Sequence, residues 1–356
     1  MIRYLDMFAG IGGFRSGLDK VGGFECVAFC EIDKYAKMSY EAMYDTEGEV
    51  YYNDARKIIP EQLPDIDLIV GGFPCQPYSR EGARNGFNDS RGTLFFEISR
   101  IAAVKKPKYL LLENVPGLLD HDGGRTFKTI LNTLEELGYD VAWSVLDGTD
   151  FGSAQQRKRV FIIGYYREKC RGRALPVPTV PSKPDSEDSF MTVWHNGRKE
   201  KIQGDISELL KEFGVPIKVK TKSGYMIALP GDSIDLAYPN LNSRRGRVGR
   251  NVAHTVTPSV NQGYYLMTSD DVPEGAENIN KVEIGGVSYK GYIRRFTPLE
   301  CWRLQGFTDE QFYKAKAAGV SNRQLYKQAG NAVTVNVIEA LARFIKEIDM
   351  EEYENE

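Results

Sequence analysis

A strand-like run followed by a cysteine between prolines constrains this chain more than any other feature. The apolar, β-branched run at residues 66–70 predicts a buried parallel strand. Two glycines break that strand, and Pro74 and Pro77 then flank Cys75. Because Pro74 fixes its own φ angle and biases the preceding residue toward an extended conformation, the cysteine lies on a stiff turn. Ligands of open α/β sheets bind beyond the carboxyl ends of the strands, so Cys75 is either a candidate nucleophile or a small buried residue in a tight turn.

Further strand-like runs alternate with helical patterns in the first half of the chain. Predicted strands cover residues 3–8, 26–30, 109–112, 141–146 and 160–165, and predicted helices cover residues 14–21, 34–43, 93–104 and 126–137. This alternation predicts an α/β fold with a mostly parallel sheet and helices on both faces.

A glycine-rich loop follows the first predicted strand. Gly10 and Gly12 would let backbone amides at a helix N-terminus approach a ligand closely, although a plain tight turn gives the same pattern. Glu31 follows the second predicted strand, ~20 residues past the glycines, where nucleotide-binding folds hold ribose hydroxyls. The combination of strand, glycine loop, helix, strand and acid predicts a site for a nucleoside cofactor.

Two charged segments are expected near the edge of the sheet that carries Cys75. Glu113 follows the predicted strand at residues 109–112, so it is either a solvated strand end or an acid that reads a base. Arg157 and Arg159 lie in a basic run that enters the next predicted strand. That run is either a charged, solvated end of a β-hairpin or part of the same site as Cys75 and Glu113.

The α/β rhythm stops near residue 167 and resumes near residue 294. The region between holds prolines and short strand-like runs, with one predicted helix near residues 206–213. Thr297 and Pro298 then have the pattern of a helix N-cap and first helical residue, and residues 328–335 are predicted to open a long helix. We therefore predict a main domain of residues 1–166 and 329–356, a smaller domain of residues 167–292, and a connecting segment of residues 293–328.

Composition limits the classes of partner. The 356-residue chain has a formal net charge of −3, so any nucleic-acid site must be a local patch. Residues 242–250 include four arginines and no acid, which makes them either such a patch or a solvated surface ribbon. Five scattered cysteines show no metal-type pairing, which predicts a reduced, cytoplasmic setting and no metal. No apolar run approaches the ~20 residues of a membrane span, so no membrane partner is expected.

Six segments, in this order along the chain, resemble the motifs of the DNA cytosine-5 methyltransferase family. They are residues 8–13, 74–76, 113–115, 156–159, 294–300 and 330–333. The resemblance covers roughly residues 1–166 and 293–346. It implies a Rossmann-like sheet of the kind found in S-adenosylmethionine-dependent methyltransferases, with a second, smaller target-recognition domain at residues 167–292.

The resemblance implies S-adenosylmethionine as cofactor, S-adenosylhomocysteine as product, and no metal. Glu31 would bind the ribose, Ile32 would lie against the adenine, and Asp54 would take the adenine amino group. The full implied cofactor set is Phe8, Gly10, Gly12, Glu31, Ile32, Asp54, Pro74, Leu94, Asn331 and Val333.

The resemblance also implies how the base reacts. Cys75 would attack C6 of a cytosine flipped out of the duplex, because the carbon that receives the methyl group cannot be reached inside the helix. Glu113 would hold N3 as a protonated acid, which requires a raised carboxyl pKa in a dry pocket. Arg159 would contact O2, with Arg157 nearby.

Double-stranded DNA is the implied partner of an enzyme that we expect to be monomeric. The implied DNA-binding residues are Ser79, Arg244, Arg245, Arg247, Arg250 and Thr255, with Thr257 an equally good choice beside Thr255. Arg245 and Arg250 are predicted to contact bases or the flanking strand, and Arg244 and Arg247 to contact phosphate. A restriction–modification or phage-protection role would add a cognate restriction endonuclease of the host as a further partner.

Three other functions share parts of this pattern. A DNA-binding protein without catalysis would not need intact Cys75, Glu113 and Arg159. An RNA cytosine-5 methyltransferase of related fold would carry a smaller, different insertion in the middle of the chain. A nicotinamide oxidoreductase would use the glycine loop and Glu31, but would leave those three residues without a task.

Overall fold

The computed structural model describes most of the chain. The described residues are 1–74, 94–170, 190–195, 198–203, 215–218, 225–229, 231–236, 248–250, 252–258, 262–266, 280–284 and 287–354. Several predictions fall outside them: Cys75, Ser79, Arg244, Arg245, Arg247 and the helix near residues 206–213.

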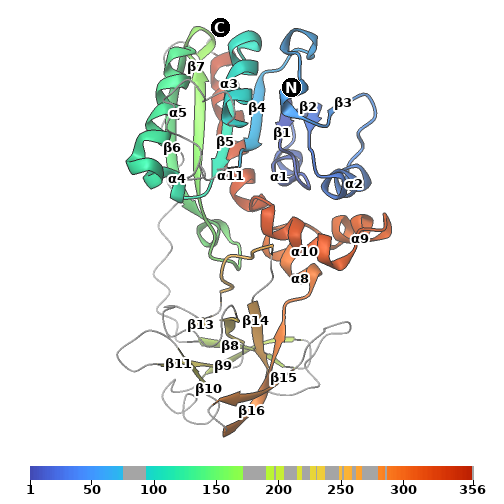
Figure 1. Cartoon of the computed structure of the whole chain (residues 1–356), viewed down its shortest axis with the longest axis vertical. Coiled ribbons are helices and arrows are strands. Elements are labelled where there is room, and N and C mark those ends of the chain that lie inside the picture. The colour runs from blue at the N-terminus through green and yellow to red at the C-terminus, as the bar shows by residue number, and fades with distance from the viewer. Residues whose placement is uncertain are drawn as a thin grey trace, which may run out of the picture.

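A seven-stranded sheet forms the centre of the larger part of the molecule (Figure 1). Its strands are β1 (Ile2–Met7), β2 (Phe24–Cys30), β3 (Val50–Tyr52), β4 (Leu68–Gly72), β5 (Tyr109–Asn114), β6 (Tyr139–Asp147) and β7 (Lys158–Tyr166). They lie in the order β3-β2-β1-β4-β5-β7-β6. β7 is antiparallel to both of its neighbours, β5 and β6, and the other neighbouring strands pair in parallel. The predicted α/β fold and Rossmann-like sheet are confirmed.

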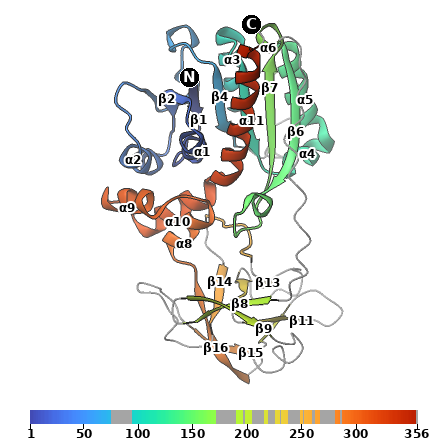
Figure 2. The same cartoon turned by 180° about the vertical axis from the view of Figure 1, so that it is seen from behind.

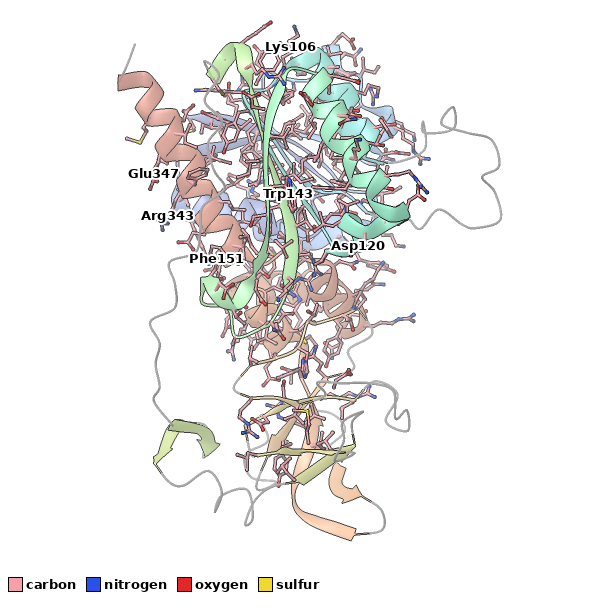
Figure 3. The ribbon with its side chains drawn as sticks, turned by 90° about the vertical axis from the view of Figure 1, so that its left-hand side faces the viewer. Lys106, Asp120, Trp143, Phe151, Arg343 and Glu347 are labelled. Atoms are coloured by element: carbon pink, nitrogen blue, oxygen red, sulfur yellow. The ribbon has the colours of Figure 1, made fainter. Side chains whose placement is uncertain are left out.

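Helices cover both faces of this sheet (Figures 1 and 2). On one face, α1 (Gly13–Val21) and α11 (Val335–Glu354) bury apolar residues against the strands. On the other face, α3 (Leu94–Lys105) and α5 (Arg125–Glu136) do the same. Figure 3 looks onto the β6 edge of the sheet, where Trp143 lies between α5 and α11. Two short helices, α4 (Gly117–Asp120) and α6 (Arg167–Cys170), complete this part of the chain.

A separate helical group carries the chain back toward the sheet. It comprises α8 (Pro298–Leu304), α9 (Asp309–Ala317) and α10 (Asn322–Asn331), whose core surrounds the buried Trp302. α9 packs against α2 (Lys34–Met43), next to the sheet. Thr297 is the N-cap of α8 and Pro298 its first residue, as predicted, and Glu300 completes a capping box.

The region between β7 and α8 is built from short β-strands, at the end of the molecule away from the seven-stranded sheet (Figure 1). They are β8 (Phe190–His195), β9 (Arg198–Gln203), β10 (Val215–Lys218), β11 (Tyr225–Ala228), β12 (Ser233–Asp235), β13 (Val248–Gly249), β14 (Gln262–Leu266), β15 (Asn280–Ile284) and β16 (Val287–Arg295). Five of them form an antiparallel sheet in the order β13-β12-β14-β16-β15. We call residues 190–295 the outer β region.

Two local predictions were wrong. The glycines after residue 70 do not break the strand, because β4 continues through Gly71 and Gly72. A Cβ at Gly71 would lie 2.7 Å from the carbonyl oxygen of Met7 on β1, so close packing of neighbouring strands explains this glycine. Residues 328–335 do not open a helix: α10 ends at Asn331, and α11 begins at Val335 after an extended turn.

No helix among the described residues is long and apolar enough to cross a membrane.

Candidate active site

The loop after β1 has the unusual backbone that its glycines suggested. Gly10 and Gly12 have φ angles of 57° and 75°, in the left-handed region that glycine adopts without strain. Phe8 has a φ angle of 56°, which is rare for a bulky residue and typical of strained functional sites. Tyr44 fixes the loop from behind, because its hydroxyl donates to the Gly12 carbonyl at 2.8 Å. Sequence reasoning missed Tyr44, which lies in no recognisable motif.

Glu31 connects the end of β2 to this loop. Its Oε2 accepts from the Gly10 amide at 2.7 Å, and its Oε1 accepts from the Asp33 amide at 2.7 Å. The carboxyl is largely buried, and burial raises its pKa. The neighbouring Ile32 is 72% exposed, an apolar side chain open to a ligand beside the loop. We call residues 8–13 together with Glu31 and Ile32 the cradle.

The remaining implied cofactor residues differ in exposure and in their local contacts. Asp54 caps a short 3₁₀ helix, and hydrogen bonds from Arg56 hold its pKa at about 2. Leu94 is half-buried at the start of α3, whereas Pro74 is exposed. Asn331, also exposed, ends α10.

Val333 brings the far end of the chain to the glycine loop. Its side chain packs on Gly13, the residue that begins α1, where an added Cβ would lie 2.6 Å from Val333 Cγ1. The sequence prediction that the last helix must return to the first part of the chain is therefore matched by the arrangement of α1 and α11.

Glu113 and Arg159 form an ion pair at the carboxyl edge of the parallel strands. Arg159 Nε lies 2.9 Å from Glu113 Oε1, and both side chains are 14% exposed. Glu113 is paired in register with Gly72, three residues before Cys75. Burial raises the pKa of Glu113 more strongly than the two nearby arginines lower it. Burial also lowers the pKa of Arg159, against the effect of Glu113.

Asn114 fixes the backbone that leads to Cys75. Its Nδ2 donates to the Phe73 carbonyl at 2.7 Å, and its Oδ1 accepts from the Val115 amide at 2.8 Å. The side chain is 2% exposed, so water competes little for these bonds. Sequence reasoning used Asn114 only as part of a motif, and its place directly after Glu113 was the available signal.

Arg157, which the resemblance implied to lie near Arg159 at the base, donates to the backbone carbonyls of separate segments. Its Nη1 donates to the Val256 carbonyl at 3.0 Å, and its Nη2 donates to the carbonyls of Gly330 at 3.0 Å and Ala332 at 2.7 Å. The residue is 3% exposed. Because both terminal nitrogens of the guanidinium are engaged by backbone carbonyls, Arg157 is a joint between segments rather than a ligand for a base.

Comparison with known proteins identifies the family. The model of the C-5 cytosine-specific DNA methylase family matches residues 2–347. The chain belongs to this family.

Relatives of this methylase include bacterial and phage enzymes. It is 32% identical to the orphan methyltransferase M.SPRI of Bacillus phage SPR, covering 96% of each chain. It is 35% identical to the type II methyltransferase M.SsoII of Shigella sonnei, covering 96% of this chain and 79% of the other. Its fold is similar to that of the S. pombe Dnmt2 methyltransferase, with a TM-score of 0.63, 17% identity, and coverage of 98% of this chain and 99% of the other.

S-adenosylmethionine is the methyl donor of the family, and the cradle of this methylase fits it. The left-handed glycines expose backbone near the start of α1, Glu31 offers carboxylate lone pairs, and Ile32 offers an exposed apolar surface. The described residues contain no group of three or more ligating side chains placed to hold a metal ion. Membership of the family sets aside the nicotinamide oxidoreductase alternative.

The described residues of the outer β region include two of the implied DNA contacts. Thr255 is half-buried, and its Oγ1 donates to the Gln156 carbonyl at 2.7 Å. Arg250 is exposed, with Nη2 donating to the Ile227 carbonyl at 3.2 Å and Nε 3.9 Å from Asp232. Gln262 holds the same segment from the other side by donating to the carbonyls of His254 and Thr255.

Proposed function

We propose that this DNA cytosine-5 methylase modifies a cytosine that it flips out of a specific double-stranded sequence, through a covalent adduct between Cys75 and C6. The buried Glu113–Arg159 pair is the observation that carries the proposal. It places an acid with a raised pKa and a guanidinium side by side, in register with the strand that leads to Cys75.

The chain's own residues account for activation of the base. C5 of cytosine is a poor nucleophile, and addition of the Cys75 thiolate at C6 turns C5 into an enamine-like carbon. Glu113, protonated, donates to N3 and stabilises the charge that builds in the ring, while Arg159 donates to O2. When bound, S-adenosylmethionine supplies the methyl group that C5 accepts. A base then removes the C5 proton, the electrons of that bond re-form the C5–C6 double bond, and Cys75 leaves as thiolate.

Asn114 supports this chemistry by positioning. Its bond to the Phe73 carbonyl fixes the backbone two residues before Cys75. An attacking sulfur has to lie close to C6 and above the ring plane, and small displacements cost much of the rate. We propose that Asn114 holds the strand end so that Cys75 and Glu113 approach the same base.

We further propose that the outer β region reads the DNA sequence, with Thr255 and Arg250 among its contacts, and that the enzyme serves restriction–modification or phage protection. The arginine-rich segment and the names of the relatives, one type II and one from a phage, support this role. Duplex DNA would be the main partner, and a host restriction endonuclease that cuts the same sequence would be a second.

Trapping of the covalent adduct tests the mechanism. Bisulfite sequencing of DNA from expressing cells first maps the modified sequence. A duplex with 5-fluorocytosine at the mapped position, mixed with enzyme and S-adenosylmethionine, should then give a complex that survives denaturing electrophoresis, because fluorine cannot leave C5 as the proton does. The Cys75→Ala variant should give none while still binding the duplex.

Two results would contradict the proposal. A denaturant-stable complex formed equally by Cys75→Ala would remove the cysteine from the mechanism. Transfer of labelled methyl groups into RNA but not into duplex DNA would instead favour the RNA methyltransferase alternative.

A further inference from the structure

Segment 252–258 of the outer β region is attached to the catalytic part by a dense set of polar contacts. The Ala253 amide donates to the Ala154 carbonyl at 2.8 Å, and the Gln156 amide donates to the Ala253 carbonyl at 2.8 Å. The Val256 amide donates to Gln155 Oε1 at 2.6 Å. Arg157 adds the bond to the Val256 carbonyl, so four consecutive residues, from Ala154 to Arg157, hold this segment.

The C-terminal end of α10 also meets segment 252–258. The backbone at Gly330 lies so close to Thr257 and Pro258 that an added Cβ would overlap Pro258 N far inside van der Waals contact. Three residues further on, Val333 packs on Gly13 at the start of α1. The end of α10 and the turn after it therefore contact both the segment that carries Thr255 and the start of α1 beside the glycine loop.

Arg157 is the side chain that joins the two. Its two terminal nitrogens reach carbonyls on segment 252–258 and on the turn, across sequence separations of 99, 173 and 175 residues. We call this set, Arg157 with the carbonyls of Val256, Gly330 and Ala332, the Arg157 junction. The planar guanidinium of arginine has several N–H donors that can reach these three carbonyls at once. The ammonium group of lysine reaches less far and cannot hold the three carbonyls in the same geometry.

We propose that Arg157 is a positioning residue that couples DNA binding to cofactor binding through this junction. A shift of segment 252–258 on DNA would move the Val256 carbonyl, and the shared guanidinium would transmit that shift to the turn that carries Asn331 and Val333. The inference rests on the proposed contacts of Thr255 with DNA and of Val333 with the cofactor. By thermodynamic linkage, the cofactor must then strengthen DNA binding by the same factor.

An equilibrium measurement of this coupling tests the proposal. The dissociation constant of S-adenosylhomocysteine is measured by calorimetry with and without a saturating unmethylated duplex of the mapped site. The wild type should bind S-adenosylhomocysteine at least ~5-fold more tightly with the duplex, the lower end of ordinary allosteric coupling. In Arg157→Lys this ratio should fall below ~2, because the charge remains but the three-way bond is lost.

The matched control lies at the other end of the same strand. Arg167 also donates to backbone carbonyls, those of Glu135 and Tyr139, but far from the junction. Arg167→Lys should keep the wild-type ratio and the wild-type methylation rate. An unchanged ratio in folded Arg157→Lys, or a wild-type ratio of one, would overturn the proposal.

Hydrogen exchange on the wild type keeps the proposal testable if Arg157→Lys does not fold. S-adenosylhomocysteine alone should slow amide exchange in residues 252–258, and the duplex alone should slow it in residues 332–335. Protection confined to the segment that each ligand touches would refute the coupling. Failure of the proposed function would look different, since no variant and no wild type would then transfer methyl groups to duplex DNA.

Discussion

The seven-stranded sheet and the outer β region differ in the size of the apolar core that stabilises each of them. The sheet is buried on both faces, and its two clusters contain residues with no exposed surface, such as Leu111 and Leu341. The described core of the outer β region consists of five buried residues, Ile217, Ala228, Ile234, Val248 and Tyr265. The first region is held by apolar packing. The second is attached through the polar contacts around Arg157 and through Ala253 and Val256, which are buried in the cluster around Trp302.

This difference teaches where each property of the enzyme resides. A rigid, deeply buried sheet can hold Glu113 and Arg159 in a fixed geometry for chemistry. A lightly packed region with short strands can change its loops without loss of the catalytic fold. We therefore expect substitutions in the sheet to alter stability or rate, and substitutions in the outer β region to alter DNA affinity or sequence choice.

The largest effect should come from the apolar core. Leu341→Ala removes a fully buried side chain from α11 and should cost about 2–5 kcal/mol of unfolding free energy. Ile234→Ala in the outer β region should cost less, because a small core relaxes around the lost methyl groups. Thermal unfolding in the presence of S-adenosylhomocysteine compares the two variants. Equal losses of melting temperature would contradict the distinction between the regions.

A catalytic substitution should sharpen the comparison next. Glu113→Gln should slow methyl transfer by at least ~10²-fold, which corresponds to an increase of about 2.7 kcal/mol in the activation free energy. The affinity for S-adenosylmethionine and the choice of target sequence should not change. The wild-type rate should also fall at high pH. The proton-donating form of Glu113 is the active one, its raised pKa keeps that form present to higher pH, and deprotonation removes it. Single-turnover rates across pH measure this, and Glu113→Gln should lose that alkaline dependence.

If Glu113→Gln binds S-adenosylmethionine poorly but methylates at the normal rate once saturated, Glu113 belongs to the cofactor pocket instead.

The smallest effect should come from Arg250. It is exposed and partly engaged with Ile227 and Asp232, so only part of its hydrogen-bonding capacity faces outward. Arg250→Ala should weaken binding to the mapped sequence by ~1–3 kcal/mol if it reads a base, and leave the rate on bound DNA unchanged. Binding titrations with mapped and scrambled duplexes at several salt concentrations distinguish a base contact of Arg250 from a phosphate contact. Equal weakening on both duplexes, with a salt slope lower by about one unit, would make Arg250 a phosphate contact.

The sequence predicted the sheet well because its strands have strong apolar runs. α2 was predicted at residues 34–43 and was found there. The break between α10 and α11 was missed, since Ala332 and Val333 have helix-compatible apolar character and the interruption is stabilised from outside by Arg157. The extension of β4 through two glycines was missed for a similar reason: its cause lies on β1.

The candidate site was predictable to the extent that motifs specify residue types. The resemblance brought Glu113 and Arg159 together before the structure showed the ion pair. It could not show that Arg157 donates to the carbonyls of Val256, Gly330 and Ala332, because these acceptors are distant in the sequence and belong to no motif. Tyr44 and Gln262 were invisible because each acts through a backbone carbonyl of another segment.

The packing of α11 against α1 also has a consequence for how the enzyme is made. The apolar face of α1, with Phe14 and Leu18, is synthesised early, and its cover of Ile338, Leu341 and Ile345 is synthesised late. A nascent chain therefore exposes this face until the residues of α11 that cover it have been synthesised. Incomplete chains would lack a closed cofactor cradle. The first methylation is therefore delayed until the whole chain, including the outer β region, has been synthesised.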